Sequence, residues 1–223
     1  MSLILNIETA TTNCSVSISK EGKPIVLKED NSKNYSHAES LHVFIDAVLK
    51  ETGMTSKDLD AVAISKGPGS YTGLRIGVSA AKGLCFALDK PLISVPTLEA
   101  LAHQVICSEG AIVAMLDARR LEVYAAIFNS NHQEIRGTEA QVLDENAFAE
   151  YLKKGKVYFV GNGVEKTKAL INHPNAVFIE GKLPSANQMS VLAFNKYKKS
   201  DFEDVAYFEP YYLKDFVALK PKS

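Results

Sequence analysis

The chain has 223 residues, which at roughly 150 residues per domain predicts one large domain or two small lobes. Hydrophobic residues make up 46% of the chain and charged residues 23%, values that exclude a long disordered or collagen-like protein. The formal net charge is −1, so no global positive field is available to hold phosphates, and any contact with nucleic acid must be local.

Cysteine usage predicts the compartment. Cys14, Cys85 and Cys107 are widely spaced and form no CxxC pair, which argues against a disulfide framework and against a zinc site. The start has no basic leader, and no stretch approaches about 18 uninterrupted apolar residues. We therefore expect a cytoplasmic protein with no targeting segment and no contact with a membrane.

The first half of the chain predicts three hairpin-connected strands and then a helix. The strands are expected at residues 3–7, 14–18 and 24–27. Ser36 and Glu39 form an S-x-x-E capping box before an apolar pattern with helical spacing over 37–52, and Gly53 marks the stop.

A short buried strand at 61–65 leads into a glycine-rich loop, GPGSYTG, at 67–73. The loop lacks both GxxxxGK[ST] and GxGxxG, so a tight strand-to-helix connection is favoured over a phosphate-binding loop. Helical spacing follows over 73–88, and a further strand is expected at 92–95.

The second half repeats the pattern of the first. An apolar run that ends at Asp117 is followed by a strand at 122–128, as the run that ends at Glu8 is followed by the strand at 14–18. This spacing is too long for a solenoid and suits a duplicated lobe. We expect two α/β lobes, an N-terminal one over residues 1–103 and a C-terminal one over 104–223, whose last helix packs back on the first.

Two acids and two hydroxyls are weak candidates for binding a cofactor. Glu8, Thr9 and Thr11 lie at the turn after the first strand, and Asp117 lies at the matching turn of the second lobe. Two acids facing each other across a cleft could hold a metal–nucleotide complex, because Mg²⁺ favours carboxylate and phosphate oxygens. The alternative is that these residues simply form hairpin turns.

The helix expected over 73–88 has an unusually wide apolar arc. Such an arc predicts a helix that is buried on two sides or that completes its burial against another chain. Small residues along one face would let a second helix approach closely. The candidate partner-binding residues on this helix are Gly73, Leu74, Gly77, Val78, Ala81, Leu84 and Cys85.

Searches for metal ligands and nucleophiles give little. Glu99 and His103 are four residues apart, but two ligands without a third make a poor site, and a solvated pair is favoured. We name no catalytic residue, because a catalytic triad is recognised by geometry rather than by sequence.

Five segments together resemble the bacterial TsaB (YeaZ) family, and the resemblance runs nearly from end to end, including PYYLKD at 210–215. They are ILNIETATTNCSVSI, SHAESL, AISKGPGSYTGLRIG, KGLCFALDKPLISVPTLEAL and MLDARRLEVYAAIF. The resemblance implies an actin-like ATPase fold (sugar kinase/Hsp70/actin) with two ribonuclease-H-like lobes and mixed sheets.

The resemblance also implies a role in tRNA modification. The role implied by the resemblance is that of the non-catalytic partner of TsaD in making threonylcarbamoyladenosine at the position-37 adenosine of certain tRNAs. TsaD and the ATPase TsaE are the implied protein partners, tRNA is met through the complex, and a homodimer is implied in isolation. The resemblance implies that the helices 37–52 and 73–88 pack against TsaD, which adds Leu41 and Ile45 to the candidate partner-binding residues. No cofactor is expected for this chain, with ATP or ADP only at the level of the complex.

The related catalytic family carries a His-x-Glu-Gly-His metal motif where this chain has Thr97-Leu98-Glu99-Ala100-Leu101. Both histidine positions are lost, and neither threonine nor leucine is a good ligand for iron or zinc, so we expect no metal here. An M22-type metallopeptidase (glycoprotease) and a weak nucleotide-dependent, kinase-like enzyme are the alternatives.

Overall fold

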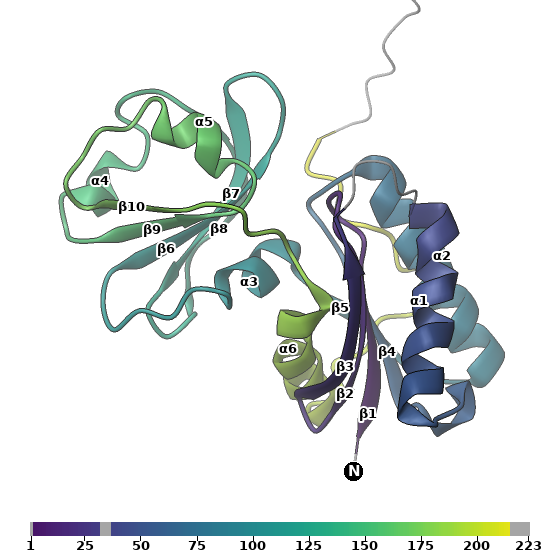
Figure 1. The fold of residues 1–223 in the computed structure, drawn as a ribbon. Coiled ribbons are helices and arrows are strands. Elements are labelled where there is room, and N and C mark those ends of the chain that lie inside the picture. The colour runs from purple at the N-terminus through teal and green to yellow at the C-terminus, as the bar shows by residue number, and fades with distance from the viewer. Residues whose placement is uncertain (1, 32–36, 215–223) are drawn as a thin grey trace, which may run out of the picture.

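The structure is a computed structural model that describes residues 2–31 and 37–214. It has two lobes, each built on a five-stranded sheet (Figure 1). The elements of the first lobe are β1 (Leu3–Glu8), β2 (Cys14–Lys20), β3 (Lys23–Asp30), α1 (His37–Thr52), the 3₁₀ helix η1 (Ser56–Asp58), β4 (Ala61–Ser65), α2 (Tyr71–Leu88) and β5 (Leu92–Val95). The remaining elements are α3 (Thr97–Ala102), β6 (Ala111–Asp117), β7 (Glu122–Asn129), β8 (Glu134–Val142), α4 (Ala149–Leu152), β9 (Val157–Val160), α5 (Val164–Lys168), β10 (Ala176–Ile179) and α6 (Ala186–Lys198).

The two sheets share one topology. Their strand orders are β3-β2-β1-β4-β5 and β8-β7-β6-β9-β10, and in both the first three strands in sequence are antiparallel while the last two add in parallel. β1 ends at Glu8 and β6 ends at Asp117, so the two acids hold equivalent places. The predicted duplication into two ribonuclease-H-like lobes with mixed sheets is confirmed.

The first sheet is buried on both faces. Alternate residues of β1 and β2, including Leu5, Ile7, Val16 and Ile18, pack under α1 and α2. Residues of the other parity, such as Ile4, pack under α6 (Figure 1). The chain therefore returns from the second lobe to cover the open face of the first.

The face under α6 carries a buried polar seam. Ser17 Oγ donates to the backbone oxygen of Ala186 at 3.0 Å, and Ser15 Oγ accepts from the Ala186 N–H at 3.0 Å. Asn6 Nδ2 donates to Ser17 Oγ at 3.2 Å and to Ser19 Oγ at 3.1 Å. The alternation of serine with Val16 and Ile18 in β2 thus reflects two buried faces, one apolar and one hydrogen-bonded to the start of α6.

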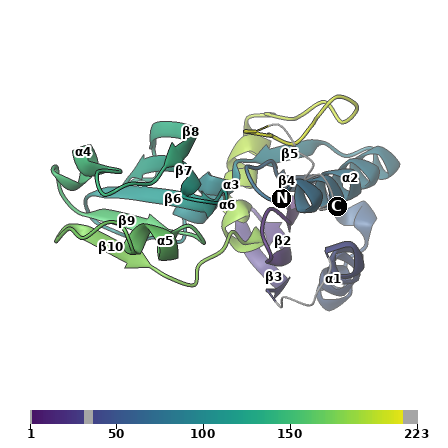
Figure 2. The ribbon, with the colours of Figure 1, turned by 90° about the horizontal axis from the view of Figure 1, so that it is seen from above.

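The second sheet packs α3 on one face and α4 with α5 on the other. Leu98 and Leu101 of α3 lie against β6, while Phe148, Leu152 and Val164 fill the opposite face. Seen from above, α3 and α6 lie between the two sheets (Figure 2). The two helices contact each other, α3 packed on the second sheet and α6 on the first.

The structure differs from the sequence-based expectation at several boundaries. α2 begins at Tyr71 rather than at 73, because Ser70 is its N-cap and accepts from the Gly73 N–H at 3.2 Å. The helix over 37–52 is confirmed, although the capping residue Ser36 lies outside the described residues. The edge strand β8 was not among the strands expected from the sequence, because its largely exposed residues give no clear apolar pattern.

Candidate functional site

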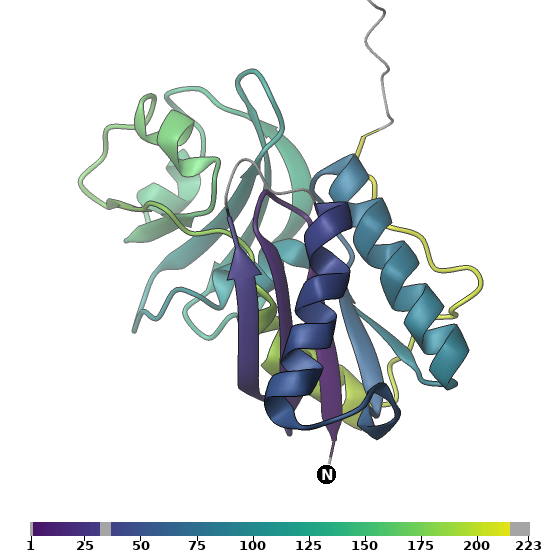
Figure 3. The ribbon, with the colours of Figure 1, turned by 45° about the vertical axis from the view of Figure 1, so that its right-hand side comes forward.

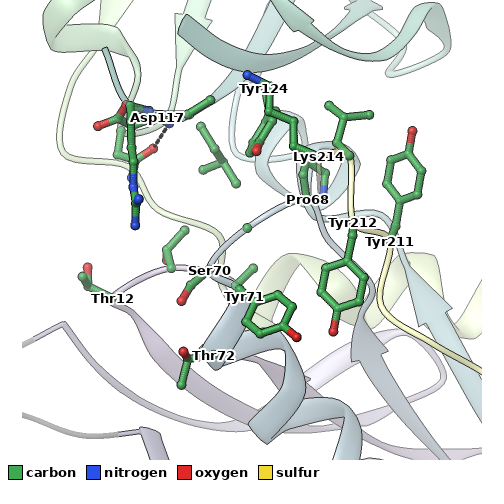
Figure 4. A pocket seen from close by; sticks show the side chains of 18 of the residues that line it. Thr12, Pro68, Ser70, Tyr71, Thr72, Asp117, Tyr124, Tyr211, Tyr212 and Lys214 are labelled. Atoms are coloured by element: carbon green, nitrogen blue, oxygen red, sulfur yellow. Dashed lines mark hydrogen bonds between the residues drawn. The ribbon is translucent and has the colours of Figure 1, made fainter. Parts of the chain in front are cut away.

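A cleft with a volume of about 610 Å³ lies between the lobes at the ends of β1 and β6. It is lined by the turn after β1, the start of α2, the turn after β6, and a segment near the C-terminus (Figure 4). Its lining includes Thr11, Thr12, Tyr71, Asp117, Arg119, Tyr124, Asn162, Tyr211, Tyr212 and Lys214.

Glu8 and Thr9, two of the predicted cofactor ligands, do not line this cleft. Both are fully buried. Glu8 Oε1 accepts from the Ala10 N–H at 2.6 Å and from Ser65 Oγ at 2.8 Å. Burial raises the pKa of Glu8 to about 7, against the opposing effect of these hydrogen bonds. The prediction that Glu8 offers a carboxylate to a ligand is wrong, because the side chain turns into the first lobe.

Asp117 lies in the cleft but is already paired. Its Oδ1 is 2.6 Å from Lys166 Nζ and also accepts from the Arg119 N–H at 2.7 Å. Partial desolvation raises the pKa of Asp117, but the Lys166 hydrogen bond and the Arg119 N–H outweigh it and hold that pKa below its ordinary value. Since Glu8 is buried in the first lobe, the expected pair of Glu8 and Asp117 across the cleft is not formed.

The glycines of the loop and of α2 let the helix sit against the turn after β1. A Cβ on Gly73 would lie 2.2 Å from the Thr9 backbone oxygen, and one on Gly77 would lie 2.2 Å from Thr9 Oγ1. The Ser70 N–H donates to the Ala10 oxygen at 2.7 Å in the same contact. At Gly73 and Gly77 the space left by the missing side chains is therefore filled mainly by the β1–β2 turn, while His37 of α1 also lies close to Gly73.

Most of the predicted partner-binding residues lie inside this chain. Six of them are buried, namely Leu41, Ile45, Leu74, Val78, Ala81 and Cys85. All of these except Leu74 belong to the hydrophobic core between the first sheet and the helices α1 and α2. Leu84 is half-buried against the same core, and Gly73 and Gly77 face Thr9. The wide apolar arc of α2 is largely used within the chain, so the buried ones among these nine residues do not form a surface for a partner. The half-buried Leu84 stays a candidate.

The outward side of the helix pair is a different set of residues. Ile76, Ala80, Gly83 and Ala87 follow one another at helical spacing along α2 and are exposed or half-buried. A Cβ on Gly83 would meet nothing within 4 Å, and Val43 on the neighbouring α1 is 56% exposed. We call these five residues the outer strip; α1 and α2 lie side by side beneath it (Figure 3).

A segment after α6, residues 203–214, brings aromatic side chains to the cleft and is called the strap. Its start pairs with β5, where the Glu203 N–H donates to the Leu92 oxygen at 2.8 Å. Lys82 Nζ of α2 donates to the oxygens of Ala206 and Phe208 at 3.0 and 2.9 Å. The Tyr211 N–H then donates to the Lys66 oxygen at 2.7 Å, which places Tyr211 and Tyr212 at the cleft.

Sequence reasoning missed the strap as part of the site. The only signal for it is PYYLKD at 210–215, which carries the family resemblance but has no periodicity of its own. The strap also reaches the other lobe, because Lys214 forms an ion pair with Glu122 at the start of β7.

The stretch Thr97–Leu101 has packing roles. Thr97 Oγ1 accepts from the Gly67 N–H at 3.1 Å, and Leu101 is fully buried. His103 Nδ1 donates to the Glu99 backbone oxygen at 2.9 Å, and the His103 ring stacks on His132 with centroids 4.2 Å apart. Glu99 and His103 are therefore half-buried rather than a solvated surface pair. Across residues 2–31 and 37–214, no group of three or more His, Cys, Asp or Glu side chains is placed to hold a metal ion.

Comparison with known proteins gives consistent results. The family model described as "TsaD: tRNA N6-adenosine threonylcarbamoyltransferase" matches residues 30–222. The chain is 32% identical to "tRNA threonylcarbamoyladenosine biosynthesis protein TsaB" of Escherichia coli, over 97% of this chain and 96% of that protein. It is 26% identical to the solved structure of YeaZ from Pseudomonas aeruginosa, with a TM-score of 0.80 over 96% of this chain and 100% of that one.

A more distant likeness concerns the fold alone. The ethanolamine utilization protein EutJ of Carboxydothermus hydrogenoformans superimposes with a TM-score of 0.51 at 11% identity, over 86% of this chain and 89% of that one. Together with the duplicated sheets, this likeness confirms the actin-like ATPase fold. Because the family model and the close relative both span nearly the whole sequence, the chain belongs to the TsaB (YeaZ) family, whose members are related to TsaD.

Proposed function

We propose that this protein is a non-catalytic subunit of the complex that makes threonylcarbamoyladenosine in tRNA. Its relatives carry the name of that biosynthesis over almost their full length, which supports a role in this modification. TsaD is the proposed catalytic partner and TsaE a further one, with tRNA met through the complex. The chain acts in the cytoplasm; within the described residues, no helix is long and apolar enough to cross a bilayer.

The observation that carries the non-catalytic part of the proposal is the use of Thr97 and Leu101 for packing. The Thr97 hydroxyl accepts a backbone hydrogen bond from Gly67, and Leu101 is buried in the second lobe's core. A hydroxyl already engaged and a side chain with no donor atom are poor replacements for metal-binding histidines. This favours a subunit over an M22-type metallopeptidase.

The state of the two acids argues against a kinase-like enzyme. A magnesium nucleotide needs carboxylates that are free to bind it, directly or through water. Glu8 is buried and hydrogen-bonded inside the first lobe, and Asp117 is paired with Lys166. We propose that this chain alone needs no cofactor, and that ATP or ADP acts only at the level of the complex.

The outer strip is the proposed contact with the partner. Ala80, Gly83 and Ala87 present little side-chain bulk, so a helix of another protein can approach α2 within the usual 8–10 Å between axes. Val43 and the 85% exposed Phe86 at the flanks add apolar surface that water would otherwise cover. In the absence of the partner, a second copy of this chain covers the same strip as a homodimer.

The test is formation of the pair with TsaD from the same organism, measured by size-exclusion chromatography and calorimetry. Gly83→Arg places a long charged side chain on the outer strip, at a position where a Cβ would meet no atom within 4 Å, so the folded monomer survives and pairing is lost. Gly137→Arg, on the exposed edge strand β8, is the matched control and pairs normally. Pairing by Gly83→Arg with unchanged affinity would show that the strip is not the interface.

A further inference from the structure

The cleft is unusually rich in tyrosine. Tyr71 comes from the first turn of α2, Tyr124 from β7, and Tyr211 and Tyr212 from the strap (Figure 4). Tyr211 and Tyr212 are 42% and 39% exposed. The rings of Tyr71 and Tyr212 lie 5.1 Å apart between centroids and are tilted by 39°, so they form neighbouring platforms rather than one closed stack. Ring faces from both lobes thus border a single open space.

Cationic side chains accompany these rings. Arg119 and Lys214 line the cleft, and the Arg75 guanidinium lies 5.3 Å from the centroid of the Tyr71 ring. Two nearby acids are compensated, because Asp117 is paired with Lys166 and Glu122 with Lys214. Glu209 of the strap, which acts electrostatically on Tyr212, makes no ion pair among the described residues. The Arg119 side chain makes no ion pair among the described residues, so it is the cation best placed to meet a phosphate.

This combination distinguishes between ligands. Aromatic faces with adjacent cations are the means by which proteins hold unpaired nucleic acid, because every base has a π-face and every linkage a negative charge. A single nucleotide has one base and would use one of the platforms, whereas the cleft offers several, supplied by three separate elements. Double-stranded RNA hides its base faces within the helix and cannot stack on tyrosine.

We propose that the cleft binds unpaired bases of a single-stranded RNA, with bases stacked on Tyr71 and Tyr212 and an adjoining phosphate held by Arg119. The choice of RNA rests on the proposed function, which supplies an RNA substrate. The chain's net charge of −1 makes this contact local, so the expected dissociation constant for the chain alone is on the order of 10–100 μM, within the range of non-specific binding. The rest of the complex then supplies the remaining affinity.

The test uses the full chain and a fluorescein-labelled, seven-nucleotide single-stranded RNA of mixed sequence, followed by fluorescence anisotropy at low salt. Tyr71→Ala and Tyr212→Ala each weaken binding by about five-fold or more, the loss expected for one base–aromatic stack. Tyr207→Ala is the matched control, because Tyr207 belongs to the same strap, is 84% exposed and lies outside the cleft lining. Its affinity equals that of the wild type.

A second pair of variants tests the phosphate contact. Arg119→Gln reduces the slope of log affinity against log salt concentration by about one, as expected for the loss of one phosphate contact. Lys153→Gln removes an exposed charge after α4, away from the cleft, and leaves the slope unchanged. Circular dichroism of every variant verifies that the fold is intact.

Several results would overturn the proposal. The first two are absence of binding to the single strand at 100 μM protein and equally tight binding of a seven-base-pair RNA duplex. The third is that Tyr71→Ala and Tyr212→Ala bind the single strand with the affinity of the wild type. The fourth is complete displacement of the RNA by equimolar AMP or Mg-ATP. The proposed function fails separately. We expect Gly83→Arg to lose pairing with TsaD but to bind the RNA normally, and Tyr212→Ala to pair with TsaD but to bind the RNA more weakly. Failure of the proposed function and failure of the RNA proposal can therefore be told apart.

Discussion

At the scale of single residues, Thr9 determines which glycines of α2 are required. Gly73 and Gly83 are both helical glycines, but a Cβ at Gly73 would meet the Thr9 backbone oxygen at 2.2 Å, and one at Gly83 would meet nothing. Gly73→Ala must therefore displace either the helix or the β1–β2 turn, whereas Gly83→Ala only gains helix propensity.

These two substitutions should have opposite effects on stability. Gly73→Ala should lower the free energy of unfolding by about 2 kcal/mol or more, and Gly83→Ala should raise it by up to about 1 kcal/mol. Urea denaturation at one pH measures both. Equal changes in the two variants would contradict the contact between α2 and Thr9.

Glu8 should make stability depend on pH. Burial raises its pKa in the folded protein to about 7 from an ordinary value of 4.5. Between these values the unfolded chain ionises Glu8 while the folded chain keeps it protonated, so the Glu8 contribution to stability is complete below about pH 4.5 and falls as the pH rises to about 7.

The comparison with Glu8→Gln isolates this contribution, since other groups titrate alike in both proteins. The difference in unfolding free energy, wild type minus Glu8→Gln, should decrease by on the order of 3 kcal/mol between pH 4.5 and 7 and then stay level. Urea denaturation across this range is the measurement. A difference that does not change with pH would mean that Glu8 ionises normally in the folded protein.

The same residues mark the limit of prediction from sequence. That Glu8 and Asp117 hold equivalent places could be predicted, because the apolar runs before them are alike. That one is buried and the other exposed could not, because this depends on Ser65 and Lys166, which lie 57 and 49 residues away. The direction of a side chain at a strand end is decided by such distant partners.

At the scale of elements, α2 and the strap stabilise each other through Lys82. The ammonium group of Lys82 donates to two strap carbonyls, those of Ala206 and Phe208. Hydrogen bonds from a charged donor to the backbone typically contribute about 1 kcal/mol or more. Lys82 therefore holds the segment that carries Tyr211 and Tyr212 to the cleft.

Lys82→Met should loosen the strap while leaving the sheets intact. Hydrogen exchange of the Phe208 and Tyr211 amides should become about five-fold to ten-fold faster, because local opening of the strap becomes easier. Lys57→Met, in the exposed η1, is the control with no strap contact. Unchanged exchange in Lys82→Met would indicate that other contacts hold the strap.

Helices with strong apolar patterns were predictable as elements, but their contacts were not. The arc on α2 correctly predicts burial on two sides, yet the sequence cannot tell an intramolecular turn from another chain as the second neighbour. The outer strip, with Ala80, Gly83 and Ala87, is inconspicuous in sequence because small residues are compatible with either side of a helix. Only the packing of α2 on β4 and on Thr9 shows which face of the helix does not contact the rest of the chain.

At the scale of the whole molecule, the duplication places a cleft where the two sheets meet, and the return of the chain ties the lobes together. α6 packs on the first sheet, and the Lys214–Glu122 ion pair links the strap to the second. The two sheets could be predicted from the repeat of apolar runs, whereas the return of α6 to the serine face of β2 rests on contacts with residues about 170 positions away. The division into an N-terminal lobe over residues 1–103 and a C-terminal lobe over 104–223 stays a prediction.

The central claim is that this chain supports tRNA modification as a subunit that pairs with TsaD through the outer strip. The most direct measurement reconstitutes threonylcarbamoyladenosine formation on tRNA with TsaC, TsaD and TsaE from the same organism, without this protein, with the wild type, and with Gly83→Arg or Gly137→Arg. We predict modification only with the wild type and Gly137→Arg. Full modification in its absence, or with Gly83→Arg at equal concentration, would contradict the account.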